Sequence, residues 1–364
     1  MVMRGGTSKG LYFLADDLPG DEAKRDELLL GAMGSPDPRQ IDGLGGAHPL
    51  TSKVAVVGPS ALDDVDVDYH FLQVVVDQAV VTDRQNCGNL LAGVGPFALE
   101  RGLVAAPPLA GEPDADEVVD VGEAEEAARI RIRMVNTGGI ATATVPLRDG
   151  RPRYDGSTAI SGVPGTAAAI RLDFENVAGS SCGALLPTGR MADEVAGVPV
   201  TLVDNGMPVV VMRAADVGVA GDESCAELES NTALRDILER IRLAAGPLMN
   251  LGDVAETTVP KLTLVSPPRA SGAVCTRTFI PHRCHDAIGV LGAVSVATAA
   301  LLPEGPAAEV VRLDGGTTVA VEHPTGTFEA AVDLDLTGDT PVVERAGIIR
   351  TARKLMDGIV FPSW

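Results

Sequence analysis

The chain has 364 residues, 45% of them hydrophobic but only 3% aromatic, so a large core must be built mainly from Val, Leu, Ile and Ala. Its formal net charge of −21 at pH 7 repels nucleic acid and anionic membrane surfaces, and we expect neither as a partner. The 5 cysteines are an odd number without a C-x-x-C motif, and no apolar signal segment opens the chain, so we expect a cytoplasmic protein with free thiols.

Strand signals dominate the first half of the chain. Residues 65–81 alternate and then become continuously apolar, and Arg129–Val135 alternates strictly, so both segments predict β-strands. Between them, Cys87–Arg101 has apolar residues at helical spacing and is followed by Gly102, which predicts one hydrophobic helix. An acidic, proline-containing link is expected at 107–126.

The second half follows the same scheme. Strand signals recur at 198–203, 209–212, 259–265 and 273–280. A charged amphipathic helical region is predicted at 222–248, and a second buried helix at 283–302. The longest uncharged stretch, 287–303, is shorter than the ~20 residues that span a membrane. Each half thus has a hydrophobic helix whose entry holds a cysteine, Cys87 or Cys284, and we expect a repeat of architecture rather than of sequence.

Residues 3–10, with the sequence MRGGTSKG, have the composition of an anion-binding loop. Gly5 and Gly6 allow backbone N–H groups to point inward, while Thr7 and Ser8 add hydroxyl donors. The spacing is not that of a Walker A phosphate loop. A tight turn between two strands is the alternative, and the pattern alone leaves it open.

A lysine follows Thr51 and Ser52. Lys53 enters the apolar run 54–57, where a charged amine would be buried. The alternative is an exposed lysine on an edge strand. Lysine and cysteine are the side chains whose pKa proteins most readily move toward neutrality, and such groups serve proton transfer at carbon.

A cysteine carries the second signal. Cys87 lies between Asn86 and the pair Gly88 and Asn89, at the predicted start of a helix. The positive end of a helix and its free N–H groups favour thiolates and bound carboxylates. The alternative is a buried structural cysteine.

Shorter motifs mark the second half. The segments PTG at 187–189 and NGM at 205–207 offer backbone donors, although both are also typical of plain turns. Arg277 and His282 precede the second predicted helix, and we expect them to bind carboxylates unless they serve only helix entry. His282 and His285 have the i, i+3 spacing of some metal sites, but no third ligand lies near them in the sequence, so no metal is expected.

Longer segments carry a resemblance to a known family. They are MRGGTSKG (3–10), GSPDPRQIDGLGG (34–46), PLTSKVAVV (49–57), NCGNLLAGVGPFALERG (86–102), GALLPTG (183–189), DNGMPVVVMRA (204–214), GPLMNLGD (246–253), TRTFIPHRCHDAIGVLGAVSVATA (276–299), EHPTG (322–326) and RTARKLMDG (350–358). Together they resemble the 2-methylaconitate isomerase (PrpF) family almost end to end, and within it the 4-oxalomesaconate tautomerase/isomerase branch.

The resemblance implies an α+β, diaminopimelate-epimerase-like fold. Such proteins have two similar domains, each a mostly β barrel-like sheet around a central helix, with the site in the cleft between them. We place the first domain at 1–178, completed by a returning C-terminal strand at 345–364, and the second domain at 179–344.

The resemblance also implies a cofactor-independent proton shift within a small polycarboxylate. Lys53 matches the lysine taken as the principal acid/base, Cys87 matches a cysteine facing it, and Ser8 matches a substrate-contacting serine. Around Cys284 the signature of the two-cysteine amino-acid epimerases of this fold is missing, which favours a lysine-based isomerase. The residues expected to contact the substrate are Gly6, Thr7, Ser8, Ser52, Asn86, Gly88, Asn89, Thr188, Gly189, Met207, Arg277 and His282.

The function expected on these grounds is isomerisation of 4-oxalomesaconate, by keto-enol tautomerisation or a 1,3-allylic shift, in the breakdown of gallate-type aromatic acids. A 2-methylaconitate or aconitate isomerase is one alternative. A non-catalytic accessory protein that binds a polycarboxylate is another. No cofactor is expected, and fold analogy adds a homodimer to the expectations.

Overall fold

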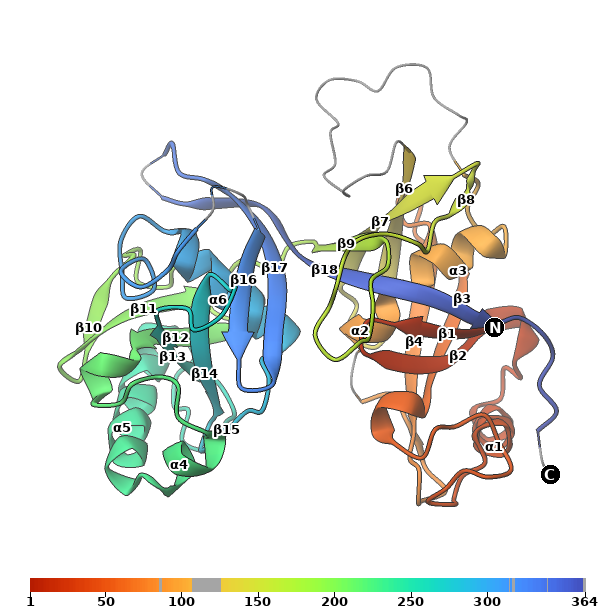
Figure 1. Cartoon of the computed structure of the whole chain (residues 1–364), viewed down its shortest axis with the longest axis horizontal. Helices are drawn as coiled ribbons and strands as arrows, with labels where there is room; N and C mark the ends of the chain where they lie inside the picture. Colours follow the sequence, from red (N-terminus) through yellow and green to blue (C-terminus); the bar gives the residue numbers. More distant parts are fainter. Residues whose placement is uncertain (85–86, 107–125, 314, 316–317, 339, 363–364) are drawn as a thin grey trace. The chain divides into compact units, whose positions relative to one another are not determined.

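The computed structural model describes residues 1–84, 87–106, 126–313, 315, 318–338 and 340–362. The chain divides into two compact units. Unit 1 comprises Met1–Asp173 and Ile349–Trp364, and unit 2 comprises Phe174–Ile348. Strand β18 (Val342–Met356) begins in unit 2 and ends in unit 1 (Figure 1).

Unit 1 is a closed ring of strands around a short helical segment. The ring runs β1 (Val2–Gly5), β2 (Ser8–Leu14), β3 (Lys53–Pro59), β4 (Val67–Val74), β6 (Glu126–Met134), β7 (Ile140–Arg148), β9 (Ala169–Phe174) and β18, which pairs with β1 again. The short strands β5 (Val81–Thr82) and β8 (Arg151–Pro152) extend β4 and β7. Helix α1 (Glu22–Met33) connects β2 to β3, and helices α2 (Gly88–Leu91) and α3 (Val94–Glu100) precede β6.

Helices pack on both faces of the sheet of unit 1, with α1 on one face and α2 and α3 on the other. Leu11, Val54 and Leu72 belong to one core cluster with Leu29 and Met33 of α1. Their neighbours along β2, β3 and β4 point to the opposite face, because successive side chains of a strand alternate. On that face α2 contacts β2, and α3 contacts β3 and β6.

The helix predicted at 87–101 is interrupted. Helix α2 ends at Leu91 and α3 begins at Val94. Pro96 has no N–H to donate, and it lies in the first turn of α3, where a helix tolerates proline. Gly93 lies at the break, where a Cβ atom would collide with the hydroxyl of Tyr12. The missing N–H of Pro96 accounts for the break, and the Tyr12 hydroxyl accounts for the glycine beside it.

Unit 2 repeats the scheme of unit 1. Its strands follow the order β10 (Asp193–Val195), β11 (Val198–Asp204), β12 (Pro208–Arg213), β13 (Lys261–Ser266), β14 (Val274–Ile280), β16 (Thr318–His323), β17 (Gly326–Asp335) and β18. From β11 to β17 the pairs alternate antiparallel and parallel. The pairs from β1 to β7 in unit 1 alternate in the same way. The expected repeat of architecture is confirmed.

The helices of unit 2 occupy the equivalent connections. Helices α4 (Cys225–Ser230) and α5 (Thr232–Leu248) lie between β12 and β13, and α6 (Val290–Leu301) lies before β16. Short 3-10 helices occur at Ala15–Asp17, Pro49–Thr51 and Ala214–Val217. The acidic link expected at 107–126 lies outside the described residues, except for Glu126, which begins β6.

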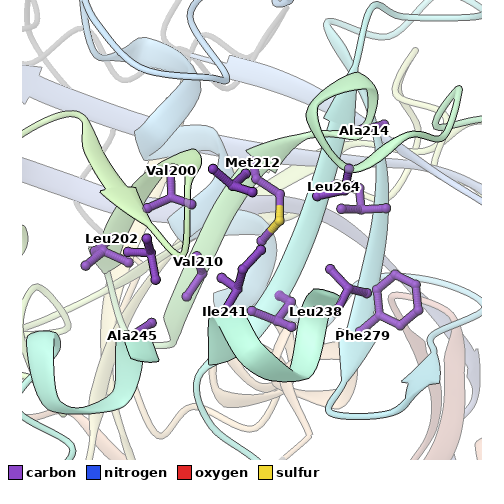
Figure 2. Packing of buried hydrophobic residues seen from close by; sticks show 14 of the residues in the cluster. Val200, Leu202, Val210, Met212, Ala214, Leu238, Ile241, Ala245, Leu264 and Phe279 are labelled. Atoms are coloured by element: carbon purple, nitrogen blue, oxygen red, sulfur yellow. The ribbon is translucent and has the colours of Figure 1, made fainter. Parts of the chain in front are cut away.

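Helices α5 and α6 cover opposite faces of the sheet of unit 2. Figure 2 shows Leu238 and Ile241 of α5 packed with Val210 and Met212 of β12. The residues between them on β12 point to the other face, where α6 contacts β11, β12, β16 and β17. Every residue of α6 from Gly292 to Ala300 is buried, which confirms the second hydrophobic helix and explains its lack of charge.

The predicted start of that helix is wrong. Cys284 does not open α6 but lies in β15 (Arg283–Cys284), which folds back on β14 so that Cys284 pairs with Phe279. The main-chain N–H of Cys284 also donates to Glu229 Oε1 at 3.0 Å. Because hairpin pairing and this carboxylate occupy the backbone here, the helix begins only at Val290.

Candidate active site

Lys53 begins β3 with its amine held against the sheet. Its Nζ donates to Gln73 Oε1 at 2.8 Å and lies 4.9 Å from the centre of the Phe71 ring. The residue is only 9% exposed. One amide and one aromatic face thus hold a nearly buried amine, and this arrangement fixes its position.

One face of β4 supports both predicted catalytic residues. Tyr69, Phe71 and Gln73 alternate along this strand and therefore point to the same side of the sheet. Gln73 bonds to Lys53, and Phe71 lies under its amine. Tyr69 Oη donates to the main-chain oxygen of Cys87 at 3.2 Å. Lys53 and Cys87, distant in sequence, are thus both held by unit 1.

Ser52 lies on the other side of the sheet from Lys53. Its hydroxyl donates to the main-chain oxygen of Val74 at 2.9 Å and accepts from Gln40 Nε2 at 2.7 Å. Ser52 is 0% exposed, so its hydroxyl is committed to protein partners. The expected substrate contact is not what this geometry provides, because neighbouring residues of an extended chain point in opposite directions. Ser52 instead ties the start of β3 to β4.

We expect Ser52→Ala to lower the free energy of unfolding by about 1–3 kcal/mol, because Gln40 and Val74 would lose a buried partner. Denaturant unfolding followed by circular dichroism would measure the change. Ser157→Ala, at an exposed serine of unit 1, is the matched control and should be neutral. Equal stability of both variants would contradict the structural role.

The glycine-rich loop and the cysteine turn contact each other. The Thr7 N–H points at Asn89 Oδ1, 3.4 Å away. Gly6 has a φ of +51°, and a Cβ atom there would collide with the same Asn89 oxygen. Glycine is required for the backbone conformation and for this close approach. Two motifs that the sequence treats separately therefore form one surface of unit 1.

Ser8 adds a hydroxyl without a partner to this surface. Ser8 and Gly10 share one face of β2, and Gly10 is the register partner of Lys53. Ser8 is buried, and its Oγ has no hydrogen-bond partner within the part of the chain that the structure describes. A buried polar atom left unpaired is costly, so this hydroxyl fits a donor that awaits a ligand.

Cys87 is the N-cap residue of α2 and is 8% exposed. Gly88 and Asn89 are the first residues of that helix. Leu90, one residue further, packs beside Gly10, where a Cβ atom would lie 3.1 Å from Leu90 Cδ2. Asn86, also expected at the site, lies outside the described residues. The turn that carries Cys87 thus lies on the same side of the sheet as Lys53.

The PTG loop of unit 2 is held by an acidic residue. Thr188 Oγ1 donates to Asp193 Oδ2 at 2.6 Å, and Arg190 Nε donates to Asp193 Oδ1 at 2.7 Å. Gly189 between them has a φ of +71°. The Thr188 hydroxyl therefore already has a protein partner, and the loop bends at Gly189.

The turn before β12 is hydrogen-bonded to α6. The main-chain oxygen of Met207 accepts from Ser295 Oγ at 2.7 Å, and Asn205 Nδ2 donates to Thr298 Oγ1 at 2.9 Å. The neighbouring Asp204 accepts the N–H groups of Ser181 and Cys182 at 2.7 and 2.8 Å. The sequence analysis did not predict these roles of Asp204 and Asn205, although a polar pair directly after Leu202 and Val203 was the available signal.

Arg277 and His282 lie on the hairpin formed by β14 and β15. The Arg277 guanidinium is nearly buried, and it donates to the main-chain oxygens of Glu223 at 2.7 Å and Thr276 at 2.8 Å. The His282 side chain is 54% exposed, with its Nδ1 3.8 Å from Glu239 Oε2. Arg277 is therefore fixed by the protein, and His282 is available to solvent.

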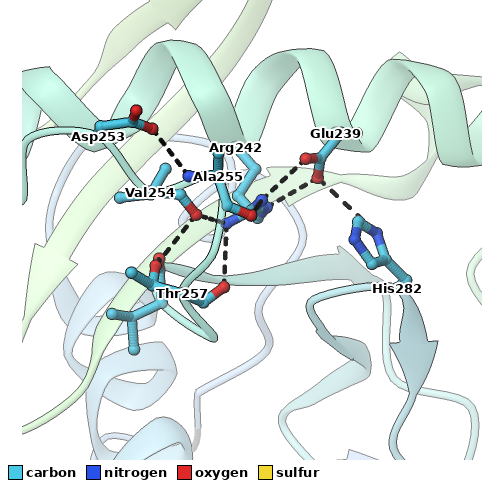
Figure 3. Close-up of polar contacts among 8 residues, drawn as sticks. Glu239, Arg242, Asp253, Val254, Ala255, Thr257 and His282 are labelled. Atoms are coloured by element: carbon cyan, nitrogen blue, oxygen red, sulfur yellow. Dashed lines mark hydrogen bonds and ion pairs between the residues drawn. The ribbon is translucent and has the colours of Figure 1, made fainter.

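A buried arginine organises the neighbouring loop. Figure 3 shows Arg242 of α5 between Glu239 and the loop that follows the helix. Its Nε donates to Glu239 Oε2 at 2.7 Å, and its Nη1 donates to the main-chain oxygen of Val254 at 2.6 Å. The Arg242 guanidinium lowers the pKa of the Glu239 carboxyl. Arg242 was not predicted, because a charged residue on an amphipathic helix ordinarily faces solvent.

The groups assembled in unit 1 suit proton transfer. An amine, a thiol and a hydroxyl that has no partner among the described residues lie on one face of the sheet. Within the described ranges no group of three His, Cys, Asp or Glu side chains is placed to hold a metal ion. No described helix is long and apolar enough to cross a membrane.

Nearly the whole chain is similar to known proteins. The chain matches the family described as "PrpF protein" over residues 1–362. It is 59% identical over 363 residues to the (4E)-oxalomesaconate Delta-isomerase of Novosphingobium sp. (strain KA1), covering 99% of this chain and 96% of that protein. It is 55% identical over 362 residues to the 4-oxalomesaconate tautomerase of Pseudomonas putida, covering 99% and 94%.

A solved structure agrees at the level of the whole chain. A crystal structure of methylitaconate-delta-isomerase superposes with a TM-score of 0.81 at 33% sequence identity. The alignment covers 98% of this chain and 93% of the other. The similarity therefore spans both units rather than one of them.

Proposed function

This chain belongs to the PrpF family, and we propose that it is an isomerase that moves a proton within 4-oxalomesaconate. The observation that carries the proposal is 59% identity over nearly the full length to a protein named for an isomerisation of that substrate. Identity of 55% to a tautomerase named for the same compound supports the same substrate.

We assign the proton transfer to Lys53. Its amine donates to Gln73 Oε1, and the residue is 9% exposed. In the proposed step the amine takes a proton from carbon next to a carbonyl and returns it elsewhere on the same substrate. A single base that donates what it removed needs no cofactor and leaves atoms and charge balanced.

The negative charge that develops in this step needs preorganised donors. The Ser8 hydroxyl has no partner among the described residues, and it is the donor that we propose for this charge. A polyanionic substrate accounts for positive groups at a site in a protein whose net charge is −21.

The test is incubation of the purified chain with 4-oxalomesaconate in D2O, followed by ultraviolet absorbance and proton NMR. We expect conversion with deuterium incorporated at the carbon that gains the proton. A new ketone or enol signal at constant double-bond position would identify tautomerisation, whereas a moved vinyl signal would identify the allylic shift.

The same assay weighs the alternatives. Turnover of 2-methylaconitate or aconitate without turnover of 4-oxalomesaconate would overturn the assignment of substrate. Identity to a protein named for 2-methyl-aconitate isomerisation is only 34%, so we do not favour that outcome. Binding of the acids without any deuterium exchange would instead identify an accessory protein.

We expect Cys87→Ser to lower kcat by about ten- to a hundredfold, less than a substitution of Lys53. Serine keeps a polar hydroxyl near the substrate but does not ionise at neutral pH. It can therefore replace Cys87 as a polar contact, but not as an acid/base. Steady-state kinetics on 4-oxalomesaconate would measure the change. A loss as large as that of the lysine variant would make the thiol an equal partner in the proton transfer.

We also propose that the protein works in the cytoplasm as a homodimer. None of the five cysteines forms a disulfide, which suits a reducing compartment. The homodimer rests on fold analogy. Light scattering coupled to size exclusion would test it, and a monomer at micromolar concentration would contradict it.

A further inference from the structure

Helix α2 is too short to hold its own shape. It consists of four residues, Gly88–Leu91, and is separated from α3 by the break at Gly93. Helices of a few residues are not stable in isolation, because the cost of forming the first turn is not recovered. The turn that carries Cys87 must therefore be held by groups outside it.

Two tyrosines supply those groups. From β4, Tyr69 Oη donates to the main-chain oxygen of Cys87 at 3.2 Å. From β2, Tyr12 Oη donates to the main-chain oxygen of Leu90 at 2.6 Å. The Tyr69 hydroxyl thus bonds to the start of the turn, and the Tyr12 hydroxyl bonds to its end. Both tyrosines are fully buried, so water cannot replace either bond without local opening.

The surroundings keep both hydroxyls in place. Tyr12 Oη fits between Gly5 and Gly93, where a Cβ atom on either glycine would collide with it or come within 2.8 Å. Burial raises the pKa of Tyr12 and Tyr69 well above the ordinary value, and the neighbouring Cys87 raises both further. Both phenols therefore stay protonated and remain donors across the working pH range.

We propose that Tyr69 is a positioning residue for Cys87, and that Tyr69 and Tyr12 together clamp the turn so that the thiol is held in one orientation toward the Lys53 side of the sheet. The two phenols touch the backbone of the turn, so they act through Cys87 and not on the substrate. The catalytic consequence of the clamp rests on the proposed function, whereas the clamp itself does not.

The test uses the three tyrosines of the chain. Tyr69→Phe removes only the hydroxyl that bonds to Cys87, and Tyr12→Phe removes the one at the other end of α2. Tyr154→Phe is the matched control in unit 1, since its hydroxyl bonds to Glu100 Oε1 at 3.3 Å rather than to the turn. Thermal melting confirms that each variant is folded.

The first measurement needs no substrate. Iodoacetamide alkylation of Cys87 is followed by mass spectrometry, with the half-buried Cys225 of unit 2 as internal reference. A buried thiol reacts through local opening, and loss of one buried hydrogen bond makes opening easier. We expect Cys87 in Tyr69→Phe to react about fivefold faster than in the wild type. Cys225 should react at the same rate in every variant.

The second measurement separates kcat from KM. For Tyr69→Phe we expect kcat about tenfold lower with KM nearly unchanged, because misplacement of a group affects the reacting step more than binding. Tyr12→Phe should show a smaller effect of the same kind. Tyr154→Phe should match the wild type in both measurements.

Each outcome decides something. Unchanged alkylation of Cys87 in Tyr69→Phe, or an equal change in Tyr154→Phe, overturns the clamp. Faster alkylation with unchanged kcat overturns the positioning role, because the turn would then be held without consequence for the reaction. If the wild-type chain does not convert 4-oxalomesaconate, the proposed function fails, and the alkylation rates alone decide whether the phenols hold Cys87.

Discussion

Replacing Lys53 with methionine should lower kcat on 4-oxalomesaconate by about a thousandfold or more, because the variant has no group to take and return the proton. Methionine has nearly the same length and can still pack on the Phe71 ring. Gln73 Oε1 loses the amine that donates to it, but the Gln73 Nε2 group still donates to the main-chain oxygen of Ser52 at 2.8 Å. The fold should therefore survive.

The matched control for this experiment is Lys24→Met, which makes the same change at an exposed position of α1. We expect the control to keep wild-type kcat and both variants to keep the wild-type circular dichroism spectrum. Steady-state kinetics and deuterium exchange at the substrate carbon measure the effect. Wild-type turnover by Lys53→Met would remove the lysine from the mechanism.

Replacing Arg242 with methionine should have the largest effect on stability. The side chain is 0% exposed, and its guanidinium bonds to Glu239 and to the main-chain oxygens of Val254, Ala255 and Thr257. Removing it leaves several acceptors of a buried network without donors. We expect a loss of about 3 kcal/mol and a fall of roughly 6–12 °C in the Tm of unit 2.

Arg240→Met is the control for the arginine experiment, since Arg240 is exposed on the same helix, α5. Differential scanning calorimetry should give a control Tm close to that of the wild type. Equal Tm values for the two arginine variants would mean that the buried network does not stabilise unit 2.

The site of unit 1 could be predicted in part, because its chemistry is carried by local motifs. Gly6 needs a positive φ, and Lys53 lies where an apolar strand begins, so both stand out in the sequence. The roles of Gln73 and Tyr69 could not be predicted in the same way. They depend on the register of β3 against β4 and on where α2 crosses that sheet, and neither is encoded within a short window.

The two errors have different origins. Periodicity predicts a continuous helix from Cys87 to Arg101, but Pro96 has no N–H to donate to the preceding turn, and the helix is broken before it. Composition places Cys284 at a helix entry, but pairing with Phe279 of another segment makes it part of a strand and overrides the local preference.

Periodicity and motifs along the chain suffice to predict the strands with strict alternation, the uncharged helix α6, the repeat of one scheme in two halves and the family. They do not predict that Ser52 turns away from Lys53, that Arg242 is buried or that Tyr69 reaches Cys87. These features arise where segments far apart in the chain meet, and hydrogen bonds and packing at such meetings depend on register and close contact in three dimensions.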